Sequence, residues 1–481
     1  MAPQRRRPHR TRRPAQQAKR CSRKAKHVNR SRLRQQRNAA RRSNRESLQR
    51  SFSWFLPNNS IFSNLFFHAN TKWNPRVLIY LIFCWSLIDN TILTDAFAQA
   101  LAQGSSLFPG LSLTYQGFMG ALLTWTPTFI PLLRNLLHRR MQEIDSPYWT
   151  VHGWVPISFD GSRSTAPRTK GNEDAFCAPN YGNSAKARSR KKKNKAKQLQ
   201  RARKEKPQSQ EPQVWITLMM HMGLRLPWSW RLGPSNSDER THVLEMLKTE
   251  TFPEKTLFCG DAGFVGYPLW KAIADKGHRF VVRVGGNVSL LSEEDGFVLK
   301  PVGDKEYSVL SWPKDAVRSK KLPLELRLVY VRVGKTWMWL LTNELDSDKL
   351  SVEQMVEFYK MRWGVEIEFR GLKQTLNRAK LRCRNPKRLL VEMEWAVMTM
   401  AVVETVTSKE QQDERTEKKE EPAKPVKRSL TRAARAFRDC LRKRDEIPDP
   451  GQDLGSKLRA AVTDDYIRKS SKKARYRMAL P

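Results

Sequence analysis

The stretch SVEQMVEFYKMRWGVEIEFRGLKQTL, residues 351–376, decides the fold. Its opening Ser-x-x-Gln pattern is a capping box, which predicts where a helix begins. Seven residues advance a helix by about 700°, roughly 20° short of two full turns. We therefore expect Tyr359, Glu366 and Lys373 to lie along one helix face, with Arg362 one turn before Glu366.

This stripe places one carboxylate beside a phenol, a guanidinium and an ammonium group. Such a combination suits an enzyme that cuts DNA, because the acid can hold a metal ion and the cations can hold phosphates. Ordinary surface helices also carry charged stripes of this kind. Periodicity alone leaves both interpretations open.

Upstream of this helix, short apolar runs alternate with helical patterns over residues 149–283, which predicts an α/β sheet. The run WVPISFD is expected to be a strand that ends at Asp160. The run KTLFCGDAGF is expected to be a strand that stops at Asp261, followed by a glycine-rich turn. An aspartate at such a junction is either a turn former or a functional acid.

Four other segments complete the expected organisation. Residues 51–148 are predicted to form a helical N-terminal region, in which the longest apolar runs fall short of the roughly 20 residues that cross a bilayer. Residues 185–210 are expected to be a basic insertion loop and residues 285–345 a β-rich insertion. Residues 386–407 are predicted to be a helix.

The formal net charge is +42, and it is concentrated at particular places. Residues 1–50 hold 19 Lys and Arg with one acid, and residues 185–206 hold 12 with one acid. Nucleic acid is the partner that fits best, because neutralising phosphates releases counterions. A membrane surface fits less well, since these tracts have no apolar face. Their simplest interpretation is a solvated tail, and residues 1–50 and 408–481 are both expected to be disordered.

Several classes of site are disfavoured. The six cysteines include no CxxC pair and no accompanying histidine cluster, which argues against zinc sites and disulfides and is typical of a reduced cytoplasmic protein. The turn RVGGN lacks the Lys-Ser/Thr of a phosphate-binding loop, so no nucleotide cofactor is expected. Glu173, Asp174 and Asp238 are interpreted as surface or capping acids. His152, His221 and His278 are interpreted as structural or surface residues.

The spacing of Tyr359, Arg362, Glu366 and Lys373 resembles the Y-R-E-K signature of the insertion-sequence-four (IS-four) family of DDE transposases. The segments ISFDGSRS and LFCGDAGFVGYPLW resemble the regions of that family around its first and second aspartates. The acids occur in the order Asp, Asp, Glu, with spacings of 101 and 105 residues. The resemblance covers roughly residues 75–407.

The resemblance implies an RNase H-like catalytic core, here residues 149–407, in which Asp160, Asp261 and Glu366 hold two divalent ions. Mg²⁺ is expected and Mn²⁺ should substitute, because hard cations prefer carboxylate oxygens. Water would attack first and free a 3′-OH at the transposon end, and that 3′-OH would then attack target DNA. Tyr359, Arg362 and Lys373 would hold the phosphates near the scissile bond.

The resemblance also implies a homodimer on DNA and a prokaryotic, nucleoid-associated location. Aromatic residues of the insertion can stack on a flipped base in related enzymes, although Trp in alternating β runs more often packs in a core. Three further functions stay open: an RNase H-like nuclease that cuts without joining, an inactive transposase-derived DNA-binding protein, and a basic RNA- or ribosome-binding protein. The insertion tryptophans are Trp312, Trp337 and Trp339.

Overall fold

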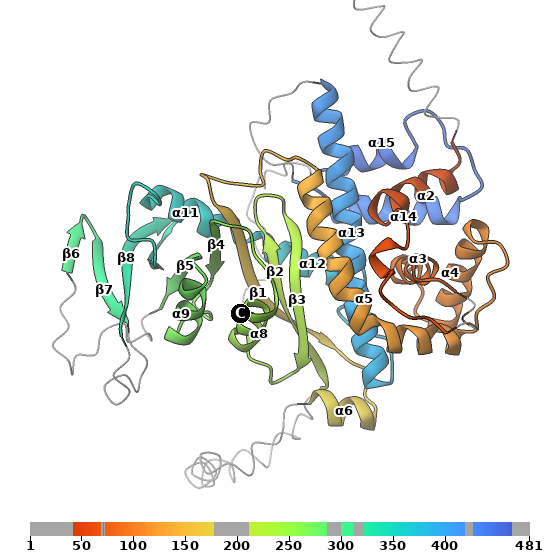
Figure 1. Cartoon of the computed structure of the whole chain (residues 1–481), viewed down its shortest axis with the longest axis horizontal. Helices are drawn as coiled ribbons and strands as arrows, with labels where there is room; N and C mark the ends of the chain where they lie inside the picture. The colour runs from red at the N-terminus through yellow and green to blue at the C-terminus, as the bar shows by residue number, and fades with distance from the viewer. Residues whose placement is uncertain are drawn as a thin grey trace, which may run out of the picture.

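The computed structural model describes residues 42–68, 71, 73–177, 211–285, 300–311, 322–418 and 427–463. Parts of the sequence analysis lie outside them: residues 1–41 of the basic N-terminal segment, the basic insertion loop at 185–210, residues 286–299 and 312–321 of the β-rich insertion with Trp312, and residues 419–426 and 464–481 of the C-terminal segment. Figure 1 shows a central sheet with a group of helices at one end and the β-rich insertion at the other. Within the described residues no helix is long and apolar enough to cross a membrane.

The sheet has nine strands within the described residues, in the order β3-β2-β1-β4-β5-β9-β8-β7-β6. The first three strands in sequence form an antiparallel meander, and β4 and β5 run parallel to β1. The first five strands therefore form the RNase H-like core that the resemblance implied. In chain order the strands are β1 (Val155–Thr165), β2 (Gln213–His221), β3 (Leu226–Pro234), β4 (Thr256–Gly260), β5 (Arg279–Val284), β6 (Lys300–Gly303), β7 (Glu306–Ser311), β8 (Leu324–Val333) and β9 (Thr336–Thr342).

The β-rich insertion is continuous with this sheet. Its last strand, β9, pairs antiparallel with β5, and Val282 lies opposite Leu341. Strands β8, β7 and β6 then extend the sheet outward. Without this pairing β5 would be an open edge, with unpaired backbone groups exposed to other chains.

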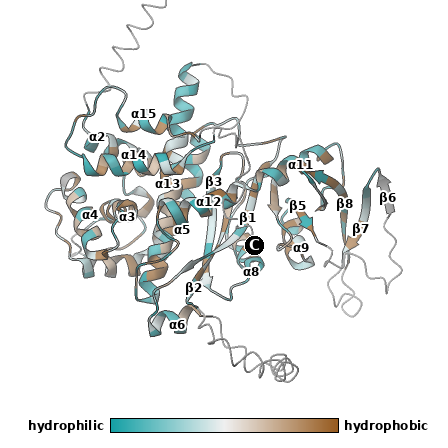
Figure 2. Ribbon diagram, turned by 180° about the vertical axis from the view of Figure 1, so that it is seen from behind, coloured by the Kyte–Doolittle hydropathy of each residue, from teal (hydrophilic) through white to brown (hydrophobic). Residues whose placement is uncertain are grey.

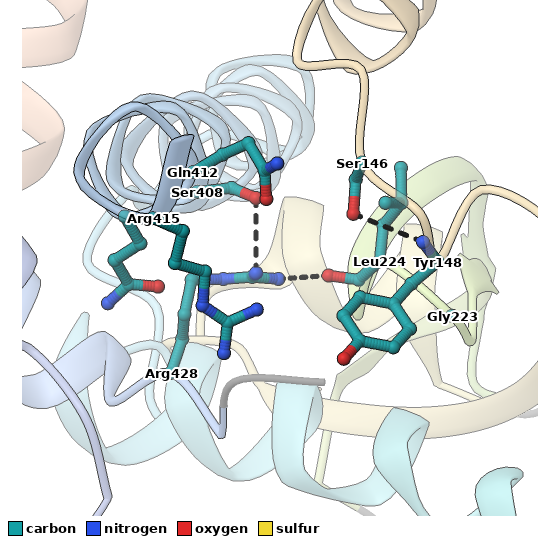
Figure 3. Close-up of a pocket in the computed structure, with 9 residues that line it drawn as sticks. Ser146, Tyr148, Gly223, Leu224, Ser408, Gln412, Arg415 and Arg428 are labelled. Carbon is teal, nitrogen blue, oxygen red and sulfur yellow. Dashed lines mark hydrogen bonds between the residues drawn. The ribbon is translucent and has the colours of Figure 1, made fainter. Parts of the chain in front are cut away.

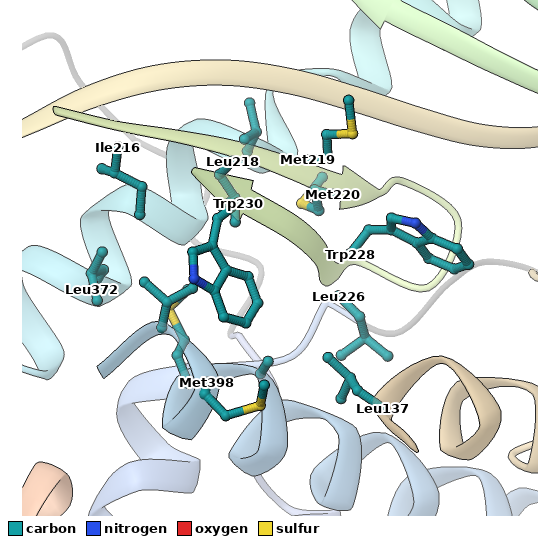
Figure 4. Packing of buried hydrophobic residues seen from close by; sticks show 14 of the residues in the cluster. Leu137, Ile216, Leu218, Met219, Met220, Leu226, Trp228, Trp230, Leu372 and Met398 are labelled. Atoms are coloured by element: carbon teal, nitrogen blue, oxygen red, sulfur yellow. The ribbon is translucent and has the colours of Figure 1, made fainter. Parts of the chain in front are cut away.

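Helices cover both faces of the core strands. Trp230 of β3 lies opposite Leu218 in the β2–β3 ladder and donates a hydrogen bond to Glu394 of α13 (Pro386–Lys418), with 2.6 Å between Nε1 and Oε2. Thr217, the next residue along β2, points to the other face and contacts His242 of α8 (Glu239–Thr249). Figure 4 shows Trp230 between the sheet and Met398. The smaller helix α9 (Tyr267–Asp275) joins β4 to β5 and packs on α8.

The N-terminal helices pack against α13 and against each other. The helix start predicted at Asn74 is confirmed: its side chain accepts a hydrogen bond from the Val77 backbone N–H, and Pro75 is the first helical residue. Two exposed prolines, Pro127 and Pro131, do not interrupt the longest helix of this region, which has 29 residues. The helices of this region are α3 (Pro75–Leu87), α4 (Leu93–Leu107) and α5 (Tyr115–Glu143).

Disorder over all of residues 1–50 was wrong at its C-terminal end. Helix α2 (Asn44–Phe55) begins with a capping box between Ser43 and Glu46 and buries Phe52 and Phe55. Its first residue is tied to a distant part of the chain, because the Asn44 side chain donates to the Lys443 carbonyl at 2.8 Å. Apolar burial outweighs the local charge here.

Disorder over residues 408–481 was also wrong for much of that segment. Helix α13 continues to Lys418, and two more helices, α14 (Leu430–Arg442) and α15 (Leu454–Arg459), pack on it. Figure 2 shows α14 and α15 beside α2, although their sequences are far apart. The physical reason is an apolar stripe on α14 at helical spacing, which the high charge of the segment obscures.

A buried arginine anchors this C-terminal segment to the core. Arg428 donates to the Ser408 hydroxyl of α13 at 3.2 Å and to the Arg225 carbonyl at 2.7 Å, and it also donates to the Leu224 carbonyl. Figure 3 shows this guanidinium between α13 and the loop that carries Leu224. The segment therefore closes against the β2–β3 hairpin and belongs to the folded unit.

Candidate active site

The two aspartates lie on neighbouring parallel strands. Asp261 directly follows β4, as predicted, but the prediction that the first strand ends at Asp160 was wrong, because β1 continues to Thr165 through its pairing with β2. Ser158 of β1 lies opposite Cys259 of β4, so Asp160 and Asp261 each stand two residues further along adjacent strands. Each carboxylate accepts a nearby backbone hydrogen bond: Gly161 N–H donates to Asp160 at 2.8 Å, and Gly263 N–H donates to Asp261 at 2.7 Å. The sheet therefore brings these two residues to one edge.

The segment predicted as one helix over 351–376 is helical but not regular. The capping box at its start is confirmed, because the side chains of Ser351 and Gln354 each accept a hydrogen bond from the other's backbone N–H. The helix bends after its first half and ends in a π-turn, a wider i→i+5 turn. Its three parts are α11 (Val352–Met361), α12 (Gly364–Arg370) and η4 (Gly371–Thr375).

Helix α12 carries Glu366 to the same sheet edge. The bridge is Arg362, whose Nη1 lies 3.8 Å from Asp160 Oδ2 and whose Nη2 lies 3.7 Å from Glu366 Oε1. The Arg362 side chain is only 6% exposed, whereas that of Glu366 is 39% exposed. A buried guanidinium thus connects the first aspartate to the glutamate.

The charge balance of this edge favours protonation of Asp160. Burial raises the pKa of Asp160 to about 6, and the negative charges of Asp261 and Glu366 act in the same direction. The Gly161 N–H and the Arg362 guanidinium oppose the shift without cancelling it. The edge therefore carries more negative charge than its single buried arginine neutralises.

Sequence reasoning missed a fourth acid at this edge, Glu239, the first residue of α8. A Cβ placed on Gly161 would lie 2.2 Å from Glu239 Oε1, and one placed on Gly263 would lie 3.7 Å from Oε2. The glycines beside both aspartates therefore leave room for this carboxylate. Burial, followed by the charges of Asp160 and Asp261, raises the pKa of Glu239 to about 7. In the sequence, the glycine that follows Asp160 indicates only that a neighbouring group comes close, and it does not identify Glu239 as that group.

Tyr359 and Lys373 flank this cluster in different ways. Tyr359 is only 4% exposed, and the Arg362 guanidinium carbon lies 5.4 Å from its ring centroid, so the ring supports Arg362. Lys373 lies in the π-turn and is partly buried, and burial lowers its pKa. The bend and the π-turn displace these residues from the single straight stripe that a regular helix would give.

The remaining residues singled out in the sequence are structural or at the surface. Glu173 and Asp174 form exposed ion pairs with Arg168 and Lys170. His221 is fully buried, and burial lowers its pKa to about 3. Asp238 precedes α8, as expected of a capping position, although its side chain makes no cap hydrogen bond.

The insertion tryptophans in the described residues form an aromatic row on one face of β8 and β9. Trp337 stacks on Tyr330 with ring centroids 5.1 Å apart, and Trp339 lies 4.6 Å from the same ring. Trp337 is 45% exposed, and the Lys305 ammonium lies 4.6 Å from its centroid. Trp337 is therefore a surface residue and not part of a core.

Two observations bear on whether these acids fit a divalent cation. Their donor chemistry fits, because all four are carboxylates gathered where negative charge is in excess. Yet no three acidic, histidine or cysteine side chains of the described residues lie close enough together to hold a metal ion. Arg362 is the group that bridges Asp160 and Glu366 in this arrangement.

Comparison with known proteins identifies the family of this chain. Residues 157–402 match the family described as Transposase DDE domain. The chain is 27% identical over 150 residues to "Putative transposase y4zB" of Sinorhizobium fredii (strain NBRC 101917 / NGR234), covering 29% of this chain and 39% of that protein. It is 38% identical over 72 residues to "Transposase InsG for insertion sequence element IS4" of Escherichia coli (strain K12), covering 15% of this chain and 16% of that protein.

A solved structure was matched over 90% of both chains, with 14% identity and a TM-score of 0.38: a cryo-EM structure of the piggyBac transposase synaptic complex with hairpin DNA. The two curated relatives are matched over much less of their length, 39% for the first and 16% for the second, so the chain spans well under half of either. The family match itself covers more than half of the chain, and it contains the strands and the helix that carry Asp160, Asp261 and Glu366. The chain therefore belongs to the transposase DDE domain family.

Proposed function

We propose that this protein is a DNA transposase of the IS-four group that cleaves DNA at the ends of its element and joins those ends to target DNA. The observation that carries the proposal is the convergence of three acids from separate elements. Asp160 lies within β1 and Asp261 directly follows the neighbouring parallel strand β4, and Glu366 is linked to Asp160 through Arg362. Separate elements converging on one sheet edge are hard to explain as a chance surface feature.

In this proposal Asp160, Asp261 and Glu366 hold the divalent ions, with Mg²⁺ as the expected cation and Mn²⁺ as a substitute. When bound, a pair of such ions activates the attacking oxygen and stabilises the leaving oxygen in phosphodiester cleavage and transfer. The excess negative charge at the sheet edge is the physical support for this assignment, because a cation would relieve it.

The protein's own residues would position the DNA. Arg362 is placed to exchange a carboxylate partner for a phosphate, since its contacts with both acids exceed 3.5 Å and its Nε has no hydrogen-bond partner in the described part of the chain. Lys373 would contact a phosphate further along. Tyr359 would act mainly by supporting the guanidinium, because its ring is buried.

Joining two element ends requires that both ends be held together, so we propose a homodimer on DNA. The resemblance to IS-four transposases and the proposed DNA partner together support a prokaryotic, nucleoid-associated location. The surrounding helices would form a scaffold for the sheet and contact DNA at its margins.

The test is a cleavage and strand-transfer assay with the purified protein, DNA carrying the element's own ends, and Mg²⁺ or Mn²⁺. Glu366→Gln keeps the shape of the side chain and removes its charge, and Glu357→Gln, on the exposed face of α11, is a matched control. We expect metal-dependent nicking and joining that Glu366→Gln abolishes and Glu357→Gln retains. Nicking without joining would indicate a nuclease, and tight DNA binding without cleavage would indicate an inactive descendant.

A further inference from the structure

A second polar surface lies next to the candidate active site, mostly outside residues 157–402 that match the family. It is a cleft of about 1170 Å³ between α14, α4 and the end of the bent catalytic helix. Gln374 and Thr375, the two residues that follow Lys373, form its near wall. Its far wall is a face of α14 with Arg435, Arg438 and Arg442. The cleft therefore begins where the proposed phosphate contacts of the active site end.

Helix α14 is fixed to the catalytic helix by direct contacts. The hydroxyls of Thr431 and Thr375 are 2.8 Å apart, and Arg438 donates to the Thr375 carbonyl at 2.7 Å. Gly371 fits closely against Leu430, because a Cβ there would lie 2.6 Å from Leu430 Cδ2. The arginine face is therefore held at a constant position relative to Glu366 and Lys373.

The arginines of this face differ in how many contacts they make with the rest of the protein. Arg438 is used structurally, because it also donates to the Leu87 carbonyl at 2.7 Å. Arg435 is exposed and pairs with no acid in the described ranges, whereas the side chain of Arg442 is 75% exposed and forms an ion pair with Asp439. The two exposed arginines are seven residues apart, which places them about 10.5 Å apart along one helix face.

This spacing matches a nucleic-acid backbone. A single DNA strand advances about 3.4 Å per nucleotide along the helix axis, so two arginines at this separation reach phosphates about three nucleotides apart. The cleft also presents the amides of Gln99 and Gln374, which suit contacts to phosphate and sugar oxygens. Three acids line it as well, and each has a partner: Asp445 pairs with Arg444, Glu446 pairs with Lys443, and Asp89 accepts a hydrogen bond from Asn377. Its lining offers few apolar groups to a protein partner, and a protein interface would need them at its centre.

We infer that the arginine face of α14 binds the phosphate backbone of the DNA strand leading away from the active site past Lys373. This inference rests on the proposed function, since it takes DNA as the substrate of that site. Arg435 and Arg442 make the phosphate contacts, Arg438 holds α14 in place, and the amides of the opposite wall line the path of the strand. The segment that sequence analysis dismissed as a tail thus extends the substrate channel.

The test measures DNA binding without catalysis, by fluorescence anisotropy in EDTA across a salt series. The full-length protein is used with a duplex carrying the element's own terminal sequence. The variant is Arg435→Ala/Arg442→Ala, and the matched control is Lys248→Ala/Lys276→Ala, which removes two exposed charges outside the cleft. Thermal unfolding of each protein shows that the fold is intact.

We expect the arginine variant to bind about tenfold more weakly, with the slope of log K against log salt reduced by about 1.8 for two lost phosphate contacts. The lysine control should stay close to wild type, and Arg435→Lys/Arg442→Lys should restore most of the binding because it keeps both charges. Equal binding and equal slopes for the arginine variant and wild type would overturn the inference while leaving the proposed function intact.

Two other results would also decide the question. Failure of the wild-type protein to bind either this duplex or one of unrelated sequence would overturn the inference together with the proposed function. Unchanged DNA binding with lost self-association, measured by sedimentation, would show that the cleft is a protein interface and would overturn the inference alone.

Discussion

Asp160→Asn should make the metal-free protein more stable, by an amount that depends on pH. The pKa of Asp160 is raised from 3.8 to about 6, chiefly by burial. A carboxyl with a raised folded pKa favours folding only while it is protonated, so its contribution is present below pH 3.8 and is lost as pH rises through 6. At 1.36 kcal/mol per pKa unit, the charged form destabilises the fold by about 3 kcal/mol at pH 8.

Asparagine keeps the shape and the acceptor oxygen, so the 2.8 Å hydrogen bond from Gly161 N–H can persist while the charge disappears. We therefore expect the free energy of unfolding to rise by about 3 kcal/mol at pH 8 and by only about 1 kcal/mol at pH 4.5. The assay is urea unfolding in EDTA at both pH values, with the exposed Asp348→Asn as a control. Added Mg²⁺ should narrow the gap at pH 8, because a cation that binds only the folded wild type stabilises it.

The reasoning would be refuted if Asp160→Asn were no more stable than wild type at pH 8, or if its advantage were the same at both pH values. Either result would mean that Arg362 already neutralises the cluster in the folded protein. Asp348→Asn should give no such gain, because removing an acid from a chain of net charge +42 only increases its self-repulsion. A gain of similar size in this control would show that the site is not the source of the effect.

Three further predictions concern Gly161 at the site, Glu404 in the buried part of α13, and Trp337 in the insertion. Gly161→Ala should lower the free energy of unfolding by about 1–2 kcal/mol, because its Cβ would clash with Glu239, and a double-mutant cycle should show most of that loss relieved by Glu239→Ala. Glu404→Gln should raise stability more at pH 9 than at pH 5, since burial raises the pKa of Glu404 and its stabilising protonated form is lost as pH rises; urea unfolding at the two pH values checks this. Trp337→Ala should cost less than about 1 kcal/mol by thermal unfolding, whereas a loss of the 3–5 kcal/mol typical of a core tryptophan would contradict its placement at the surface.

The core strands and the three acids could be predicted from the sequence, because the patterns that indicate them are local. The short apolar runs that lead to Asp160 and Asp261 are visible in the sequence and mark two strands, although β1 continues past Asp160 to Thr165. Parallel pairing of those strands then brings the two residues together, whatever the rest of the chain does. The capping box at Ser351 likewise needs only four residues to define a helix start.

The features that sequence reasoning missed depend on contacts between distant segments. Glu239 gives no local signal, since an acid in the first turn of a helix is ordinary and its role appears only when Gly161 is seen beneath it. The C-terminal helices were wrongly predicted to be disordered, because the prediction used the mean charge of the whole segment. On α14 the buried residues lie on one side and the arginines on the other, so mean composition conceals a strongly amphipathic helix.

The arrangement around Arg362 connects these observations to function. Gathering four carboxylates at one edge raises the free energy of the folded state, and one buried guanidinium with long contacts offsets only part of it. An edge optimised for stability alone would carry fewer acids or a closer ion pair. The site instead keeps an excess of negative charge. Its positive partner, Arg362, belongs to the helical segment whose C-terminal end contacts α14. A cation and a DNA phosphate together would supply what this edge lacks, the cation taking the carboxylates and the phosphate taking the arginine. On this reasoning metal and DNA should each bind more tightly in the presence of the other, because each frees the partner that the second ligand needs.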